Sequence, residues 1–198
     1  MIKNVTIIGG GVLGSQIAFQ TAFTGHSTTI YLRTKIKLKN IKNSYIDAIN
    51  TMKNEVNINT WSLGIADFDN FNYKKTLKKI NETIDNIKLE MDLNKSLKDA
   101  DLVIESMTED FNAKKEVYQK IADIMDEKTI LVTNSSTFLP SKFAKYTKRS
   151  DKYLALHFAN SIWKNNTAEV MKISKTSDES FNEVINFAKD IRMIPLPL

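Results

Sequence analysis

The sequence predicts an α/β domain with a doubly wound, mostly parallel sheet, and three observations support this prediction. Apolar runs of strand type alternate along the chain with segments of helical periodicity. The glycine pattern Gly9-x-Gly11-x-x-Gly14 lies directly after the first apolar run and before the first helical pattern. Polar residues follow the ends of several predicted strands, where open parallel sheets bind ligands. Together these features predict a Rossmann-type dinucleotide-binding domain over residues 1–198.

The glycine pattern predicts a binding site for a nucleotide diphosphate. Gly9 permits the tight turn between strand and helix, Gly11 lets the backbone approach the phosphates, and Gly14 lets the helix close onto the strand. The helix then offers free N–H groups, including those of Val12 and Leu13, to the anion. A plain tight turn is the alternative interpretation, because glycine patterns also occur without a ligand.

The remaining elements are predicted from hydrophobic periodicity and turn residues. The first helix is expected to stop at Gly25. Apolar steps of three and four predict helices at residues 35–53, 77–87 and 111–125, and a last helix follows a capping box formed by Thr176 and Glu179. Strands are predicted at residues 28–32, 87–93, 101–105, 129–133, 153–157 and 169–173. Residues 54–73 lose periodicity and are expected to form an irregular insertion.

Composition indicates a globular protein of the cytoplasm. Hydrophobic residues make up 42% of the chain, enough for a full core, and the absence of cysteine excludes disulfides and thiolate metal sites. No metal-binding residues are proposed. No apolar segment is long enough to span a bilayer, and the first strand begins too early for a signal peptide. The net charge of +5 invites a nucleic-acid partner, but the lysines are scattered along predicted helix faces and are interpreted as solvated surface. A small-molecule partner that carries phosphate is expected instead.

Arg33 bears on the choice between NAD and NADP. It ends the second predicted strand 19 positions beyond Gly14, where an NAD-binding unit usually carries an acidic residue for the ribose 2′-hydroxyl. Arg33 cannot accept that hydrogen bond, but its guanidinium can pair with a 2′-phosphate. The sequence therefore favours NADP over NAD. An arginine stacked on the adenine or turned to water is the alternative.

His157 is the candidate general base. It closes an apolar strand at the predicted ligand edge, and twelve residues later Glu169 begins a segment that can return beside it. A carboxylate on one imidazole nitrogen fixes the tautomer and leaves the other nitrogen to take a proton. A structural histidine is the alternative. The second histidine, His26, follows a helix stop and is assigned a structural role.

Several motifs resemble those of the 3-hydroxyacyl-CoA dehydrogenases, including their 3-hydroxybutyryl-CoA, sugar-acid and carnitine relatives. In the family's order they are residues 7–14, 100–106 with Glu109, 134–137, 156–160 and 169–170. Together they are far more specific than the glycine pattern alone. The resemblance implies an oxidoreductase of fatty acid metabolism. Such an enzyme uses NAD or NADP to interconvert a secondary alcohol, a 3-hydroxyacyl-CoA or a related 3-hydroxy acid, and its ketone.

The resemblance also implies roles for the candidate catalytic residues. His157 looks like the catalytic histidine that takes the hydroxyl proton as hydride leaves for the nicotinamide, and Glu169 looks like its carboxylate partner. Ser136 looks like the serine that hydrogen-bonds the reacting oxygen. Asn160 resembles the asparagine that contacts cofactor or substrate.

On the cofactor side, Glu109 and Lys114 match family positions that hold the nicotinamide-side ribose. Three features depart from the family pattern. Arg33 replaces an acidic residue, which leaves both NAD and NADP open, and Ser161 stands where proline is usual, so a changed substrate edge is expected. Residues 54–73 do not match the CoA-contacting hairpin, so a CoA thioester is only one of the substrates that the resemblance allows.

The family continues with an all-helical domain that forms its dimer interface and closes the active site, and that domain is missing from this chain. A homodimer is therefore expected only with the missing domain. The isolated domain is expected to show little turnover, because positioning of the substrate and exclusion of water would be incomplete. A non-catalytic dinucleotide-binding or sensing domain is the alternative function.

Overall fold

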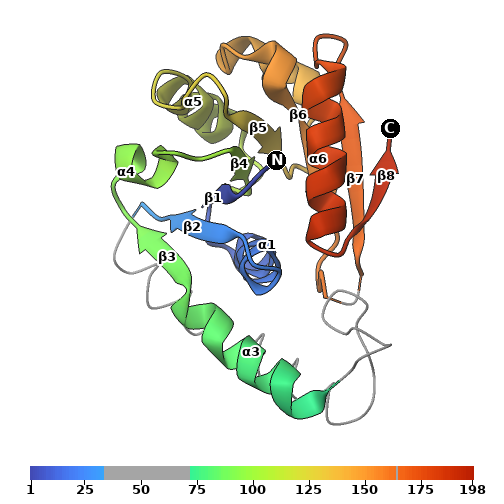
Figure 1. Ribbon diagram of the computed structural model, residues 1–198. Helices are drawn as coiled ribbons and strands as arrows, with labels where there is room; N and C mark the ends of the chain where they lie inside the picture. Colours follow the sequence, from blue (N-terminus) through green and yellow to red (C-terminus); the bar gives the residue numbers. More distant parts are fainter. Residues whose placement is uncertain (34–71, 164) are drawn as a thin grey trace.

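An eight-stranded sheet organises the part of the chain that the computed structural model describes, residues 1–33, 72–163 and 165–198 (Figure 1). The strand order is β3-β2-β1-β4-β5-β6-β7-β8. Strands β1 to β6 are parallel, β7 is antiparallel to β6, and β8 is parallel to β7. This confirms the predicted doubly wound, mostly parallel sheet, whose order reverses between β1 and β4. The strands are β1 (Asn4–Ile8), β2 (Ser27–Tyr31), β3 (Ile87–Glu90), β4 (Leu102–Glu105), β5 (Ile130–Thr133), β6 (Tyr153–Phe158), β7 (Thr167–Lys172) and β8 (Ile194–Pro197).

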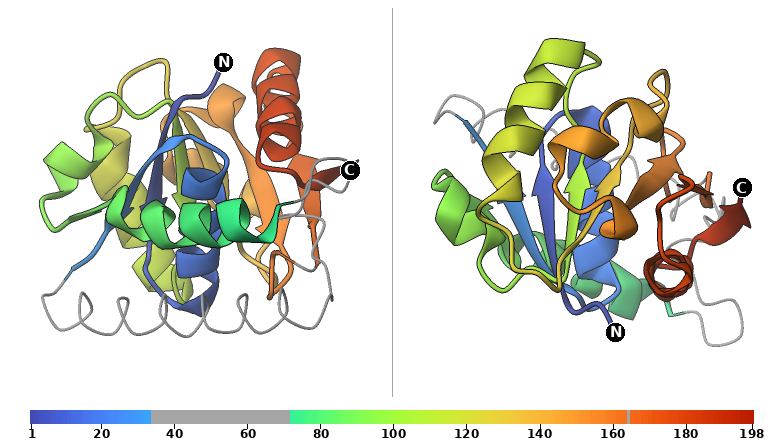
Figure 2. Two further views of the ribbon diagram at one scale, coloured as in Figure 1. Left: turned by 60° about the horizontal axis from the view of Figure 1, so that its bottom comes forward. Right: turned by 90° about the horizontal axis from the view of Figure 1, so that it is seen from above.

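Helices cover both faces of the sheet, as the two views of Figure 2 show. One face carries α1 (Val12–Phe23), α3 (Tyr73–Asp85) and α6 (Asp178–Asp190), and α3 lies alongside α1. The other face carries α4 (Leu93–Leu97), α5 (Phe111–Ala122) and short 3-10 turns around residue 143. Within the described residues, no helix has both the length and the apolar character needed to cross a membrane. The helix predicted at 35–53 and nearly all of the insertion predicted at 54–73 lie outside the described residues.

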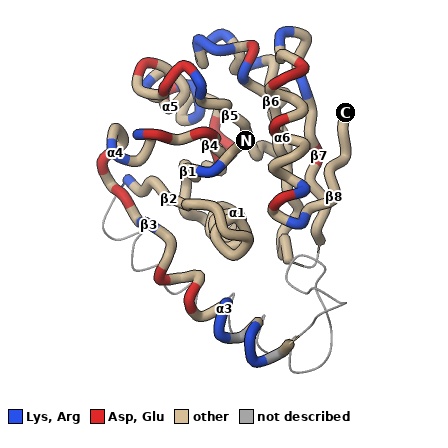
Figure 3. Tube along the Cα trace, in the orientation of Figure 1, with Lys and Arg blue, Asp and Glu red and all other residues tan. Residues whose placement is uncertain are grey.

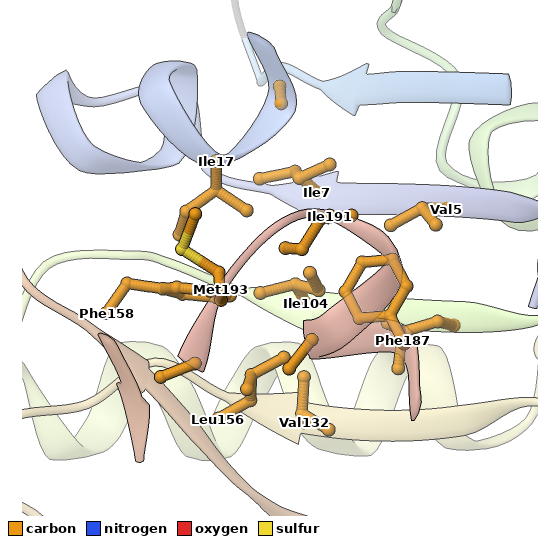
Figure 4. Packing of buried hydrophobic residues seen from close by; sticks show 14 of the residues in the cluster. Val5, Ile7, Ile17, Ile104, Val132, Leu156, Phe158, Phe187, Ile191 and Met193 are labelled. Atoms are coloured by element: carbon orange, nitrogen blue, oxygen red, sulfur yellow. The ribbon is translucent and has the colours of Figure 1, made fainter. Parts of the chain in front are cut away.

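The central strands are buried on both faces, which explains why they read as continuous apolar runs in the sequence. On the face covered by α1 and α6, the buried side chains of β1, β4, β5 and β6 form one apolar layer (Figure 4). Each fully buried side chain of this kind contributes about 1.5–3 kcal/mol by leaving water. The layer includes Val5, Ile7, Ile104, Val132 and Leu156, and it packs against Ile17, Phe187, Ile191 and Met193.

The strand β3, at residues 87–90, is shorter than the strand predicted at residues 87–93. β3 ends at Glu90, whose carboxylate accepts the next two backbone N–H groups and turns the chain. Asp92 then caps α4 by accepting a backbone N–H of its first turn at 3.2 Å. Leu93 is therefore helical, and Leu89 is 38% exposed. The alternating apolar residues of 87–93 predicted a strand with one buried face, and this prediction was wrong. The two local caps at Glu90 and Asp92 determine where the chain turns.

The last helix begins one residue later than the predicted capping box requires. Ser177 is the N-cap of α6, and its hydroxyl accepts the N–H of Ser180 at 3.1 Å. Thr176 is engaged elsewhere, since its hydroxyl donates to the Tyr153 carbonyl at 2.7 Å and accepts the N–H of Ile173. The predicted Thr176 cap is therefore wrong, and the contact of Thr176 with β6 is the physical reason.

The sequence does not predict β8, because prolines are rare in strands. Ile194 and Leu198 donate their N–H groups toward the β7 side, to the carbonyls of Asn166 and Val170. The backbone nitrogens of the alternate residues, 195 and 197, consequently face away from β7, toward the open edge of the sheet. A missing N–H costs no ladder hydrogen bond there, so prolines are tolerated.

Arg149 joins the end of α5 to the segment that leads into β5. Its guanidinium donates four hydrogen bonds of 2.7–3.3 Å to backbone carbonyls. We expect Arg149→Met to lower the free energy of unfolding by at least about 2 kcal/mol, because these carbonyls lose a charged donor. Urea unfolding measures the effect, and Lys175→Met, at an exposed site, should change stability by less than about 0.5 kcal/mol. Equal stability of the two variants would contradict this role. The acceptors are the carbonyls of Ala122, Met125, Asp126 and Thr129.

Candidate active site

Close backbone contacts at two glycines hold the turn between β1 and α1. Gly9 has a φ of +109°, and a Cβ at this position would lie 2.3 Å from the carbonyl oxygen of Ser106. A Cβ on Gly14 would lie 2.1 Å from the carbonyl oxygen of Gly9. Gly11 is different, because a Cβ there would meet nothing within 4 Å. The fold itself therefore requires Gly9 and Gly14, whereas Gly11 leaves room for the close approach of a ligand.

The N-terminus of α1 faces this space without a side-chain cap. Its N-cap residue is Gly11, which has no side chain to accept the first N–H groups. The helix carries no charged residue of its own, as Figure 3 shows. Free N–H groups and the positive end of the helix dipole form a natural site for a diphosphate. The other described α-helices, by contrast, are all capped by side chains, namely Asn72, Asp92, Asp110 and Ser177.

A crevice of about 300 Å³ opens where the strand order reverses. The segments that follow β1, β2, β4 and β5 form its walls. Most of the site residues proposed from the sequence line this crevice. They are Gly9, Gly11, Val12, Leu13, Gly14, Arg33, Glu109 and Ser136. Tyr31, Ser106, Met107 and Asn134 also line it. Its position at the switch between β1 and β4 is the usual ligand site of doubly wound sheets.

His157 and Glu169 meet across the antiparallel pair β6–β7. They are direct partners in the strand register, and His157 Nδ1 lies 3.0 Å from Glu169 Oε2. Partners of this kind carry their side chains on the same face of the sheet, so the return of β7 creates the contact. The carboxylate orients the ring and leaves Nε2 directed away from it. The two side chains are 25% and 43% exposed, so a substrate can reach the pair.

Ser136 connects this pair to the crevice. Its hydroxyl oxygen lies 3.0 Å from His157 Nε2, and the residue also lines the crevice wall. Ser136, His157 and Glu169 therefore form one hydrogen-bonded chain beside a site that suits a nucleotide. Nε2 is the atom positioned to take a proton from a bound hydroxyl group. Serine hydrolases align a serine, a histidine and a carboxylate in a similar way, so the adjoining crevice distinguishes this site from theirs.

A buried ion pair supports the opposite wall. Lys114 Nζ lies 2.7 Å from Glu105 Oε1 and 3.0 Å from Glu109 Oε1. Lys114 and Glu105 are fully buried, so Lys114 lies behind Glu109 and not on the crevice surface. Glu105 was not predicted as a partner of Lys114. The available signal was the spacing of Lys114 with Val117 and Ile121, which places a lysine on the buried face of α5.

Glu105 has all its acceptor sites occupied. Besides Lys114, its carboxylate accepts the N–H of Met107 and the hydroxyls of Tyr118, at 2.6 Å, and Thr133, at 2.8 Å. Burial, reinforced by the charge of Glu105, raises the pKa of Tyr118 well above its ordinary value. Tyr118 therefore stays protonated and remains a hydrogen-bond donor to the carboxylate.

Glu109 presents an ionised carboxylate to the crevice. Burial alone would raise its pKa, but hydrogen bonds from Ser135, Thr137 and Lys114, together with the charge of Lys114, outweigh burial. The pKa of Glu109 is consequently held below its ordinary value. Its oxygens can accept hydrogen bonds from hydroxyl groups such as those of a ribose.

Asn160 lies in the turn just beyond β6 and does not line the crevice. Its side chain is exposed, and its carbonyl accepts the Nδ2 group of Asn165 at 2.7 Å. Asn134, which belongs to the motif at 134–137 but was given no role, joins two strand ends instead: Oδ1 accepts the N–H of Phe158 at 2.9 Å, and Nδ2 lies 3.4 Å from Ser106 Oγ. No local pattern identifies these two partners, since only the paired strands bring them together.

Comparison with known proteins shows the family to which this chain belongs. The family model described as "3-hydroxyacyl-CoA dehydrogenase, NAD binding domain" matches residues 4–198. The mitochondrial hydroxyacyl-coenzyme A dehydrogenase of Rattus norvegicus is 27% identical over 196 residues, which cover 99% of this chain. The chain spans 59% of the length of that relative.

Two solved structures share the fold over the whole chain. A diketoreductase, described as catalysing dual reactions of dicarbonyl compounds, has 43% sequence identity and a TM-score of 0.88, and the match covers 64% of its chain. The (S)-3-hydroxybutyryl-CoA dehydrogenase of Ralstonia eutropha has 21% identity and a TM-score of 0.83, again over 64% of its chain. At this lower identity the second structure supports the fold alone.

Proposed function

We propose that this chain, which belongs to the 3-hydroxyacyl-CoA dehydrogenase family through its NAD-binding domain, carries the cofactor site and the acid–base pair of an alcohol-oxidising enzyme. The reaction interconverts a secondary alcohol, a 3-hydroxyacyl-CoA or a related 3-hydroxy acid, and its ketone. The hydrogen-bonded chain of Ser136, His157 and Glu169 beside an uncapped helix N-terminus is the observation that supports this function best.

The residues of the crevice fit a dinucleotide. The open space at Gly11 and the free N–H groups of Val12 and Leu13 would hold the diphosphate, and the Glu109 carboxylate would hold a ribose hydroxyl. When bound, the nicotinamide supplies the hydride acceptor. Lys114 is buried behind the Glu109 carboxylate. It would therefore support cofactor binding by holding Glu109 in place, and not by contacting the cofactor itself.

Side chains of the protein carry out the proton transfer. Oxidation removes a hydride from the carbinol carbon and a proton from its oxygen, and His157 Nε2 accepts the proton. Glu169 holds Nδ1–H and stabilises the imidazolium that results. Ser136 donates a hydrogen bond to the reacting oxygen and steadies its developing charge. Asn160, in the turn after the strand of His157, would contact substrate or cofactor as the resembling asparagine of the family does.

The proposed activity is tested on the natural full-length protein that carries this chain. NADH formation from a 3-hydroxyacyl-CoA and from the free 3-hydroxy acid is followed by absorbance. The reverse assay uses a dicarbonyl compound, because the diketoreductase is 43% identical over the whole chain. Hydride transfer with any of the three supports an oxidoreductase. Tight cofactor binding without turnover of any of them would favour the non-catalytic, sensing alternative.

Arg33 is the basis for proposing NADP as a cofactor in addition to NAD. The residue is exposed and lines the crevice just beyond β2. We expect Arg33→Asp to weaken NADP binding and strengthen NAD binding, shifting the ratio of the two Kd values by at least about tenfold, or about 1.4 kcal/mol. Titration calorimetry with both cofactors measures the ratio. Unchanged or stronger NADP binding in the variant would assign Arg33 to another role.

The chain by itself is proposed to bind the cofactor but to turn substrate over slowly. It spans 59% of its mitochondrial relative, and both members of the His157–Glu169 pair are open to solvent. We propose that closure of the site and homodimer formation need a part like the one of that relative that residues 1–198 do not match. Turnover and sedimentation of this chain, measured beside the natural full-length protein, test the assignment. Equal turnover of the two would reject it.

A further inference from the structure

One side chain ties the turn after the His157 strand to the helix at the diphosphate site. Gln16 Oε1 accepts the backbone N–H of Ser161 at 2.8 Å and lies 3.4 Å from the N–H of Ile162. Gln16 lies two residues beyond Gly14 in α1, and Ser161 lies four residues beyond His157. The contact therefore spans the two halves of the site.

The backbone of the turn is held in an uncommon conformation. Ser161 has a φ of +58°, in the left-handed region that residues with a Cβ rarely adopt. Asn165 closes the turn from the other side, because its N–H donates to the Ser161 carbonyl at 2.9 Å and its Nδ2 group to that of Asn160 at 2.7 Å. A strained residue persists only where its surroundings impose it, and such residues cluster at functional sites.

The sheet alone leaves the two halves of the site only indirectly connected. α1 follows β1, whereas His157 belongs to β6, and β4 and β5 lie between these strands. Hydride transfer requires the acceptor, the carbinol carbon and the base in close alignment, and a displacement of about 1 Å can cost about 100-fold in rate. A direct contact at the ligand edge removes that freedom.

We propose that Gln16 and Ser161 act as positioning residues that fix the distance between the bound cofactor and His157. We name this contact the Gln16–Ser161 latch. It rests on the proposed oxidoreductase function and adds two residues to it. The latch requires a side-chain acceptor at position 16. At position 161 it requires a free backbone N–H and a residue that adopts a left-handed φ. Each requirement can be removed or retained by a single substitution.

The experiment compares two pairs of variants in the natural full-length protein. Gln16→Met removes the acceptor, whereas Gln16→Glu keeps it. Ser161→Pro removes the N–H and cannot adopt a positive φ, whereas Ser161→Gly keeps the N–H and adopts it easily. Gln119→Met, at an exposed position of α5, is the matched control for the glutamine change. The measurements are kcat with both substrates saturating, the Kd of the cofactor, and the deuterium isotope effect at the carbinol carbon.

We expect Gln16→Met and Ser161→Pro to lower kcat by about 10- to 100-fold, with a larger isotope effect and little change in cofactor Kd. Gln16→Glu and Ser161→Gly should retain most of the kcat, and Gln119→Met all of it. The latch is overturned if Gln16→Met keeps its kcat, or if the Met and Glu variants lose kcat and cofactor affinity in parallel. If the wild type transfers no hydride at all, the proposed function fails, which is a different result.

Discussion

Replacing His157 with alanine is expected to lower kcat for alcohol oxidation by about 10²–10⁴-fold, the usual contribution of a positioned general base. The Kd for the cofactor should change little, because the glycine turn and Glu109, and not His157, line the cofactor crevice. Single-turnover formation of NADH measures the chemical step, and titration calorimetry measures the affinity. Unchanged turnover would reject His157 as the base.

Glu169→Gln is the companion variant. Glutamine keeps a side-chain oxygen within reach of Nδ1, but it lacks the negative charge that stabilises the imidazolium. We expect a smaller loss than for His157→Ala, and no further loss when the two substitutions are combined. Additive losses would mean that the two residues act separately, which the 3.0 Å contact argues against.

Breaking the buried Glu105–Lys114 pair is expected to have the largest effect on stability. Lys114→Met leaves the Glu105 carboxylate buried without its cation, and removing one partner of such a pair costs about 3–5 kcal/mol. The NAD affinity should fall as well, because Glu109 loses the same partner at 3.0 Å. Urea unfolding and cofactor titration measure the two effects.

The exposed pair Lys120–Glu116 on the same helix provides the control. Its side chains are 60% and 65% exposed, and pairs of this kind contribute about 0–1 kcal/mol. Lys120→Met should therefore leave both unfolding and NAD affinity nearly unchanged. A loss of less than about 1 kcal/mol in Lys114→Met would show that the buried charges do not support the crevice wall. A double-mutant cycle with Glu105→Leu isolates the coupling.

The fold was predictable because its signals are local. The glycine turn, the apolar runs of β1, β4, β5 and β6, and the Gly25 stop each depend on residues within a few positions, and Gly25 has the expected positive φ of +101°. One failed prediction was overridden by a contact from a distant strand, and the other by a turn that forms locally. Thr176 looked like a helix cap but bonds to Tyr153, and the alternation around Leu89 gave way to the turn at Glu90.

The candidate site was only partly predictable for the same reason. His157 and Glu169 could be proposed from their strand positions, but their contact depends on the antiparallel return of β7. The partners of Lys114 lie on β4 and in the loop after it, so spacing could mark the lysine as buried without naming Glu105. Gln16 and Ser161 are 145 residues apart, and no local pattern connects them.

The proposed reaction depends on a nicotinamide that binds next to the imidazole of His157. A crystal structure of the natural full-length protein with bound NAD⁺ tests it most directly. We expect the diphosphate to lie on the N–H groups at Gly11 to Leu13, and C4 of the nicotinamide to face His157 Nε2 across a gap that one carbinol group can fill. A diphosphate bound away from this turn, or a nicotinamide directed away from His157, would contradict it.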